Sequence, residues 1–126
     1  MTHLFGSSEL WRVWSALLAI LVLGIAALGC GSPTPEITVV MTEFSFEPNK
    51  VNVTRGTKTL VRLENQGQVE HNFSIPQLNI TSLTIQPGKA GTVEVTSPRG
   101  PLKIVCTVPG HEEAGHVAEL VVAARR

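Results

Sequence analysis

The sequence contains no aspartate and no tyrosine, and its 126 residues include only two cysteines, two tryptophans and four phenylalanines. Its charges cancel, because ten Lys and Arg residues face ten acidic residues, all of them Glu. Nine of each sign follow Cys30. A neutral domain lacks the basic face that nucleic-acid binding requires, so nucleic acid is excluded as a partner. It would also meet its partners with little long-range electrostatic steering.

Long apolar runs are scarce too, and the chain has a single one, from Val13 to Leu28. Its sixteen residues fall short of the roughly 20 that a membrane-spanning helix needs. Arg12 precedes the run, so the layout is that of a secretory signal with a thin basic region. Residues 1–30 are therefore predicted to be a signal peptide or an N-terminal membrane anchor.

The run ends in Ala27-Leu28-Gly29-Cys30, which resembles the lipobox of bacterial lipoproteins. The departure is Ala27, where that family usually has Leu. The resemblance implies that Cys30 becomes the lipidated N-terminus, which would hold the rest of the chain outside the cytoplasmic membrane, on the periplasmic or cell-surface side. An uncleaved anchor and a released protein are the alternatives.

Residues 31–36 form the predicted linker, because Pro33 and Pro35 favour an extended, fairly stiff segment. Such a linker reaches only roughly 15–20 Å at about 3.1 Å per residue. The domain that follows would stay close to the membrane surface, which favours membrane-associated partners.

Residues 37–124 are predicted to be one all-β domain. Short alternating segments rich in β-branched residues are separated by turn signals such as Pro87-Gly88. No helical period is present. The predicted strands cover residues 37–41, 51–54, 59–65, 71–75, 91–96, 102–106 and 117–123. About seven or eight such strands indicate a Greek-key β-sandwich.

The chemistry is concentrated in one stretch, Cys106-Thr-Val-Pro-Gly-His111-Glu-Glu-Ala-Gly-His116. Pro109-Gly110 marks a turn, so the stretch is predicted to be a tight loop between two strands. With Cys30 lipidated, Cys106 has no disulfide partner, and a lone thiol is then buried and inert, or it is a ligand or a nucleophile. A thiolate beside imidazoles favours one copper ion, or zinc, over hard cations.

This loop resembles the ligand loop of cupredoxins, the blue-copper family, and His71-Asn72-Phe73 resembles that family's upstream histidine ligand. The resemblance implies a cupredoxin-like fold in which Cys106, His71 and His111 hold copper. It also implies that the backbone N–H of Asn72 donates to the thiolate. The implied function is electron transfer by a monomer that exchanges electrons with membrane-associated redox proteins, and not enzymatic catalysis.

His116 stands where the family usually has Met. If His116 binds, its stronger donation should shift the site toward tetrahedral geometry, lower the potential and weaken the blue colour. If it swings away, the site is three-coordinate or takes water. Three alternatives to electron transfer remain at this point: copper capture and delivery, a red-copper-like site that binds a small molecule such as nitric oxide, and a structural zinc site. Glu112 and Glu113 are predicted to be solvated loop charges.

Overall fold

The computed structural model describes residues 31–125. The predicted signal or anchor and the predicted lipidation site, Cys30, lie outside this range. The described part has one short 3-10 helix and otherwise consists of strands and loops. Its elements are β1 (Glu36–Thr42), β2 (Ser45–Glu47), β3 (Lys50–Thr54), β4 (Thr59–Asn65), β5 (Ser74–Ile75), η2 (Pro76–Leu78), β6 (Ile80–Thr81), β7 (Ala90–Val95), β8 (Leu102–Val105) and β9 (Val117–Ala123). Within residues 31–125, no helix has the length and apolar character to span a membrane.

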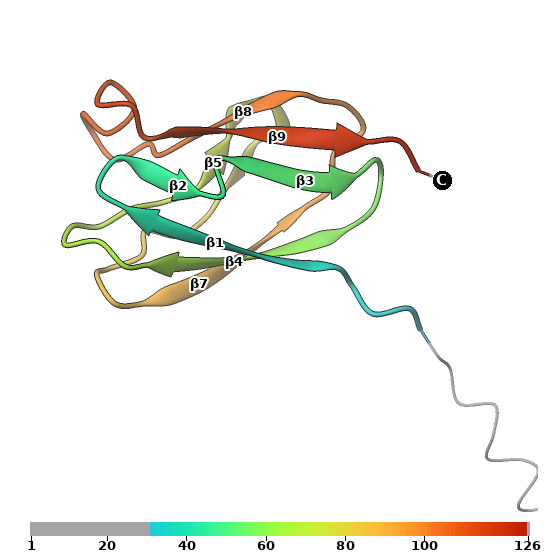
Figure 1. The fold of residues 1–126 in the computed structure, drawn as a ribbon, viewed down its shortest axis with the longest axis horizontal. Coiled ribbons are helices and arrows are strands. Elements are labelled where there is room, and N and C mark those ends of the chain that lie inside the picture. The colour runs from blue at the N-terminus through green and yellow to red at the C-terminus, as the bar shows by residue number, and fades with distance from the viewer. Residues whose placement is uncertain (1–30, 126) are drawn as a thin grey trace, which may run out of the picture. The chain divides into compact units, whose positions relative to one another are not determined.

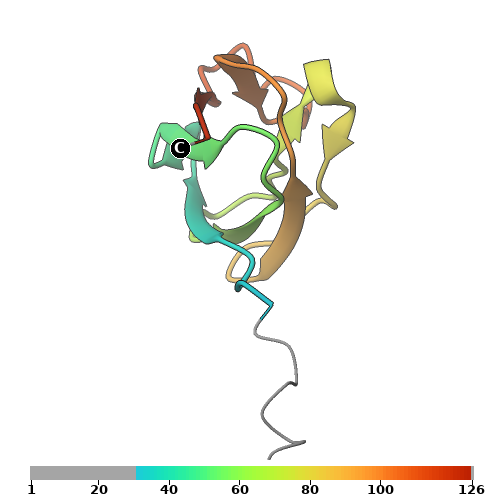
Figure 2. The same cartoon turned by 90° about the vertical axis from the view of Figure 1, so that its right-hand side faces the viewer.

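The strands form two sheets, with the orders β2-β1-β4-β7 and β3-β9-β8-β5-β6. Each sheet contains one parallel pair, β1 with β4 and β3 with β9, and the other pairs are antiparallel. The two sheets lie one above the other in Figure 1 and surround a common interior in the turned view of Figure 2. The predicted all-β sandwich is therefore confirmed.

Side-chain alternation explains why these segments pack as a sandwich. In β4, Val61 and Leu63 are fully buried while Arg62 faces solvent, because successive side chains of a strand point to opposite faces. β1 and β3 alternate in the same way. Both sheets contribute to the apolar core, which includes Phe46 and Phe73 in edge-to-face contact with ring centroids 5.9 Å apart.

The structure differs from the strand prediction in three details. β2 and β6 were not predicted, so residues 31–125 contain nine strands where about seven or eight were expected. The strand predicted over residues 71–75 is regular only at Ser74–Ile75, and His71 forms an isolated bridge with Ile85. Glu36, assigned to the linker, is the first residue of β1. Segments of two or three residues are too short to show a period, and they depend on pairing with distant partners.

The loops that connect these strands gather at two ends of the sandwich. The turn after β1, the loop after β4 and the loop before β9 lie at the left end in Figure 1, and the C-terminus lies at the other end. This left end carries the predicted ligands.

Candidate metal centre

The loop between β8 and β9 is closed at its base by the two residues that flank it. Cys106 follows the last residue of β8, and His116 precedes the first residue of β9. The backbone N–H of Cys106 donates to the carbonyl of His116 at 3.1 Å. Antiparallel pairing of the two strands thus places a thiol and an imidazole side by side, although nine residues separate them in the sequence.

Inside the loop, two tight turns bring His111 back toward the base. The N–H of His111 donates to the carbonyl of Val108 at 3.0 Å, and the N–H of His116 donates to the carbonyl of His111, also at 3.0 Å. Gly110 and Gly115 have φ angles of +82° and +98°. Only glycine adopts such angles without strain, so these two glycines allow the loop to fold.

His71 reaches the same point from a distant segment. Its backbone pairs with Ile85 through two hydrogen bonds, of 3.1 and 2.8 Å. The buried side chain of Asn65 supports this region, because its amide group donates to the carbonyls of Val69 and Ile85, both at 2.8 Å. The bridge and the amide contacts together fix the loop that delivers the His71 ring.

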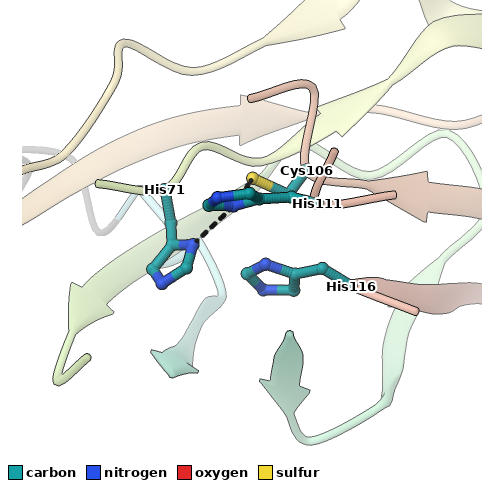
Figure 3. A group of neighbouring side chains, drawn as sticks. All are labelled: His71, Cys106, His111 and His116. Atoms are coloured by element: carbon teal, nitrogen blue, oxygen red, sulfur yellow. Dashed lines mark hydrogen bonds between the residues drawn. The ribbon is translucent and has the colours of Figure 1, made fainter. Parts of the chain in front are cut away.

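The four predicted ligands converge. One ligand atom from each of His71, Cys106, His111 and His116 lies within 4.8 Å of the others. The Nδ1 atoms of His71 and His111 are 3.2 Å apart, and the Sγ atom of Cys106 is 3.5 Å from the Nδ1 atom of His111. Figure 3 shows the thiol and the three rings directed toward one another. In a metal complex these nitrogen and sulfur atoms would face a single ion.

The burial of these groups fits a metal and does not fit an apolar core. His71, Cys106 and His116 are fully buried, and His111 is half-buried. The Nε2 atom of His71 and both ring nitrogens of His116 have no hydrogen-bond partner. Buried polar groups without partners are costly and call for an explanation. A bound ion would satisfy one nitrogen of His116 directly, and the soft donor set suits copper.

Burial also holds two of the imidazoles in the uncharged form that binds metals. Desolvation first, and then the proximity of His71 and His111, lower the pKa of His116 to about 4 against the opposing effects of the Ser45 backbone and of Glu43. Desolvation, and then the proximity of His111, likewise lower the pKa of His71. Neutral imidazoles offer a lone pair, so both rings are ready to act as ligands at neutral pH.

Asn72 links the ligand loop to the segment that carries His71. Its backbone N–H points to the Sγ atom of Cys106 at 3.5 Å. Its side chain donates to the hydroxyl of Thr107 and accepts from the backbone N–H of Thr107, each at 2.8 Å. The contact with sulfur is the one that the family resemblance implies for this asparagine.

The turn between β1 and β2 is a part of the site that the sequence analysis missed. Phe44 packs edge-on against His111 with ring centroids 5.5 Å apart, and Phe46 lies against His116 at 4.2 Å. Phe44 has a φ of +62° and is 45% exposed. A positive φ is rare for a bulky residue and is often found near functional sites. The alternating phenylalanines of Phe44-Ser45-Phe46 are the sequence feature from which this part of the site could have been predicted.

Glu112 and Glu113, predicted to be loop charges, and Met41 are not part of the four-residue cluster. Glu112 and Glu113 are exposed, and Glu112 pairs with Lys103 at 2.6 Å. Met41, whose thioether could otherwise be considered as a ligand, is fully buried in the hydrophobic core. Within residues 31–125, Cys106 is a free cysteine.

Comparison with known families identifies the domain. The model of the cupredoxin-like domain family matches residues 15–121. The chain belongs to the cupredoxin-like family. A comparison with curated proteins finds no match.

Solved structures share the same fold. Auracyanin B superposes with a TM-score of 0.64 at 19% identity, covering 75% of this chain and 93% of its own. The reduced auracyanin of Roseiflexus castenholzii gives 0.63 at 21% identity and coverages of 74% and 99%. Auracyanin A, described as a "blue" copper protein of Chloroflexus aurantiacus, gives 0.56 at 21% identity and coverages of 70% and 99%. At these identities the likeness shows the cupredoxin fold.

Proposed function

We propose that this protein is a one-electron carrier with one copper ion held by His71, Cys106, His111 and His116. The observation that carries the proposal is the convergence of one thiol and three imidazoles within 4.8 Å in a cupredoxin-like domain. Copper supplies the Cu(I)/Cu(II) couple. The protein binds the ion, fixes the positions of its ligands and excludes water.

Strand pairing and backbone hydrogen bonds fix the positions of all four ligands, and fixed ligands suit an electron carrier. Two ligands extend directly from paired strands, and the third, His111, is held by hydrogen bonds within the loop. The fourth, His71, is fixed by its bridge to Ile85. A site that keeps its ligands in place requires little rearrangement when the charge of the ion changes.

His111 provides the route for electrons to the surface. It is the half-buried member of the four, whereas the other three are fully buried. Around it lie the loop residues Val108, Pro109 and Ala114, which are partly or fully exposed, and Phe44, which contacts its ring. A redox partner that covers this apolar surface would come close to an imidazole ligand.

The site of action we propose is the outer face of the cytoplasmic membrane. Lipidation of Cys30 or retention of residues 1–30 as an anchor would hold the domain there. The supporting observation is the apolar run that ends in Ala27-Leu28-Gly29-Cys30. Membrane-associated redox proteins are the expected donors and acceptors.

The test is redox cycling of the copper-loaded protein. We expect an intense thiolate-to-copper absorption band that ascorbate removes and that an oxidant restores over many cycles without loss of copper. Transfer of the copper to a chelator or partner on reduction would instead indicate copper delivery. A band that shifts on addition of nitric oxide would indicate a small-molecule site, and retention of zinc without a band would indicate a structural site.

A further inference from the structure

The outer nitrogen of His71 is unexplained by the metal centre. Its Nδ1 atom faces His111 and the other ligands, so the Nε2 atom points away from them. The Nε2 atom is fully buried and has no hydrogen-bond partner among the described residues. Histidines that bind a metal through one nitrogen almost always donate the other N–H to a carboxylate, a carbonyl or a water. An acceptor for this N–H group is therefore expected nearby.

The carboxylate of Glu43 and this nitrogen both lie beside Gly67. A Cβ atom placed on Gly67 would lie 2.7 Å from the Oε1 atom of Glu43 and 3.1 Å from the Nε2 atom of His71. Both atoms therefore border the space beside one glycine that has no side chain. A movement of the Glu43 side chain into this space would bring the carboxylate toward the imidazole.

Glu43 is held at this position by the loop that precedes His71. It occupies the turn between β1 and β2, and its Oε1 atom accepts the backbone N–H of Gln68. The N–H of Gly67 in turn donates to the Oδ1 atom of the buried Asn65 at 2.9 Å. Backbone hydrogen bonds, first that of Gln68, lower the pKa of Glu43, so the group is ionised at neutral pH. Its charge acts on His71 and on His116.

We propose that Glu43 is a positioning residue for the copper site, whose carboxylate accepts a hydrogen bond from the Nε2–H group of His71 when Nδ1 binds the metal. This inference rests on the proposed copper function. The contact would select the tautomer of His71 with a free Nδ1 lone pair and fix the plane of its ring. A nearby anion also favours the ion of higher charge, so Glu43 lowers the reduction potential. Gly67 fits this role because the Cβ atom of any other residue there would crowd both groups.

Variants of the full chain test this proposal. Glu43→Gln removes the charge, and Glu43→Ala removes the acceptor as well. Glu70→Gln is the matched control, because it removes the same charge next to His71 from a carboxylate that is hydrogen-bonded to Gln86 at 2.8 Å. The first measured quantity is the reduction potential. The second is the rate at which the His71 Nε2 proton exchanges with water, followed by NMR. The Cu(I) form and the zinc-loaded form are used for NMR because both are diamagnetic.

We expect Glu43→Gln to raise the ratio of Cu(I) to Cu(II) at a given potential about threefold. This corresponds to a reduction potential about 28 mV higher, at 59 mV per tenfold change for one electron. The effect is modest because Glu43 is exposed to solvent. Glu43→Ala should also speed up exchange of the His71 proton at least severalfold, and Glu70→Gln should change neither quantity as much. If both Glu43 variants match Glu70→Gln in reduction potential and in proton exchange rate, the proposed positioning role of Glu43 is contradicted. Lack of a charge-transfer band in the wild type would instead contradict the proposed function, and the exchange rate in the zinc form would still test the contact.

Discussion

The two sides of the metal centre are built in different ways. On one side, a single loop of eleven residues provides Cys106, His111 and His116, and its ends are joined by one hydrogen bond between Cys106 and His116. On the other side, His71 depends on segments far apart in the sequence: the bridge to Ile85, the side chain of Asn65 and the turn that carries Glu43. The first side contributes most of the ligands. The second contributes one ligand and most of the surrounding support.

This difference predicts that changes on the two sides will have different consequences. Replacing a ligand in the loop should change the spectrum of the bound metal without unfolding a sandwich whose strands pair independently of it. Replacing a support on the other side should change the stability of the fold or the potential while the ligand set remains. The following variants test this separation, beginning with the largest expected effect.

Cys106→Ser should abolish the thiolate-to-copper band completely, because Sγ is the sulfur atom among the four clustered ligand groups. Visible absorption after copper loading provides the measurement, and far-UV circular dichroism checks that the fold remains. Cys30→Ser is the control, since it removes the other cysteine of the chain. A band that survives in Cys106→Ser would contradict the assignment of this thiolate.

Phe46→Ala should destabilise the protein by about 3–5 kcal/mol, the range for removing a buried aromatic side chain. Phe46 is 1% exposed and packs against both Phe73 and His116. Phe44→Ala, two residues away, should destabilise the protein much less than Phe46→Ala, because Phe44 is 45% exposed. Urea unfolding of both apoproteins measures the contrast, and equal losses would contradict the structure of this turn.

The metal-free protein should lose stability as the pH falls below 6.5. The pKa of His116 is lowered from 6.5 to about 4 on folding, so between these values the unfolded chain binds more protons than the folded one. At 1.36 kcal/mol per pKa unit, the loss approaches about 3 kcal/mol near pH 4. The lowered pKa of His71 acts in the same direction.

Urea unfolding at several pH values tests this dependence. The matched variant is His116→Met, which removes the titrating group and should flatten the curve by most of that amount. A slope that remains the same in His116→Met would show that His116 is not the group that resists protonation.

Asn72→Ala should cost about 1–3 kcal/mol, because it leaves the backbone N–H of Thr107 without its buried partner. The side chain of Asn72 makes two hydrogen bonds of 2.8 Å to Thr107, and the contact of its backbone N–H with sulfur would remain. The copper spectrum should therefore change little while the urea midpoint falls. A changed spectrum at unchanged stability would reverse the roles assigned to its side chain and backbone.

The sequence allowed the loop side to be predicted because its information is local. The spacing of Cys106, His111 and His116 and the glycines between them lie in one stretch, and strand alternation predicted β8 and β9 around it. The other side could not be predicted in this way. The contact of Glu43 with the loop before His71 joins residues about 25 positions apart and leaves no periodic signal. β2, which places Phe46 against His116, has only three residues.

The most direct test of the four-ligand copper centre compares wild type with His116→Met, using visible absorption, EPR and redox titration of the copper-loaded full chain. The structure predicts an intense thiolate band in the wild type. It also predicts a bluer spectrum, narrower copper hyperfine splitting and a higher potential in His116→Met, because a thioether donates more weakly than an imidazole. Identical spectra and potentials in the two proteins would remove His116 from the ligand set, and the absence of any thiolate band in the wild type would contradict the copper centre itself.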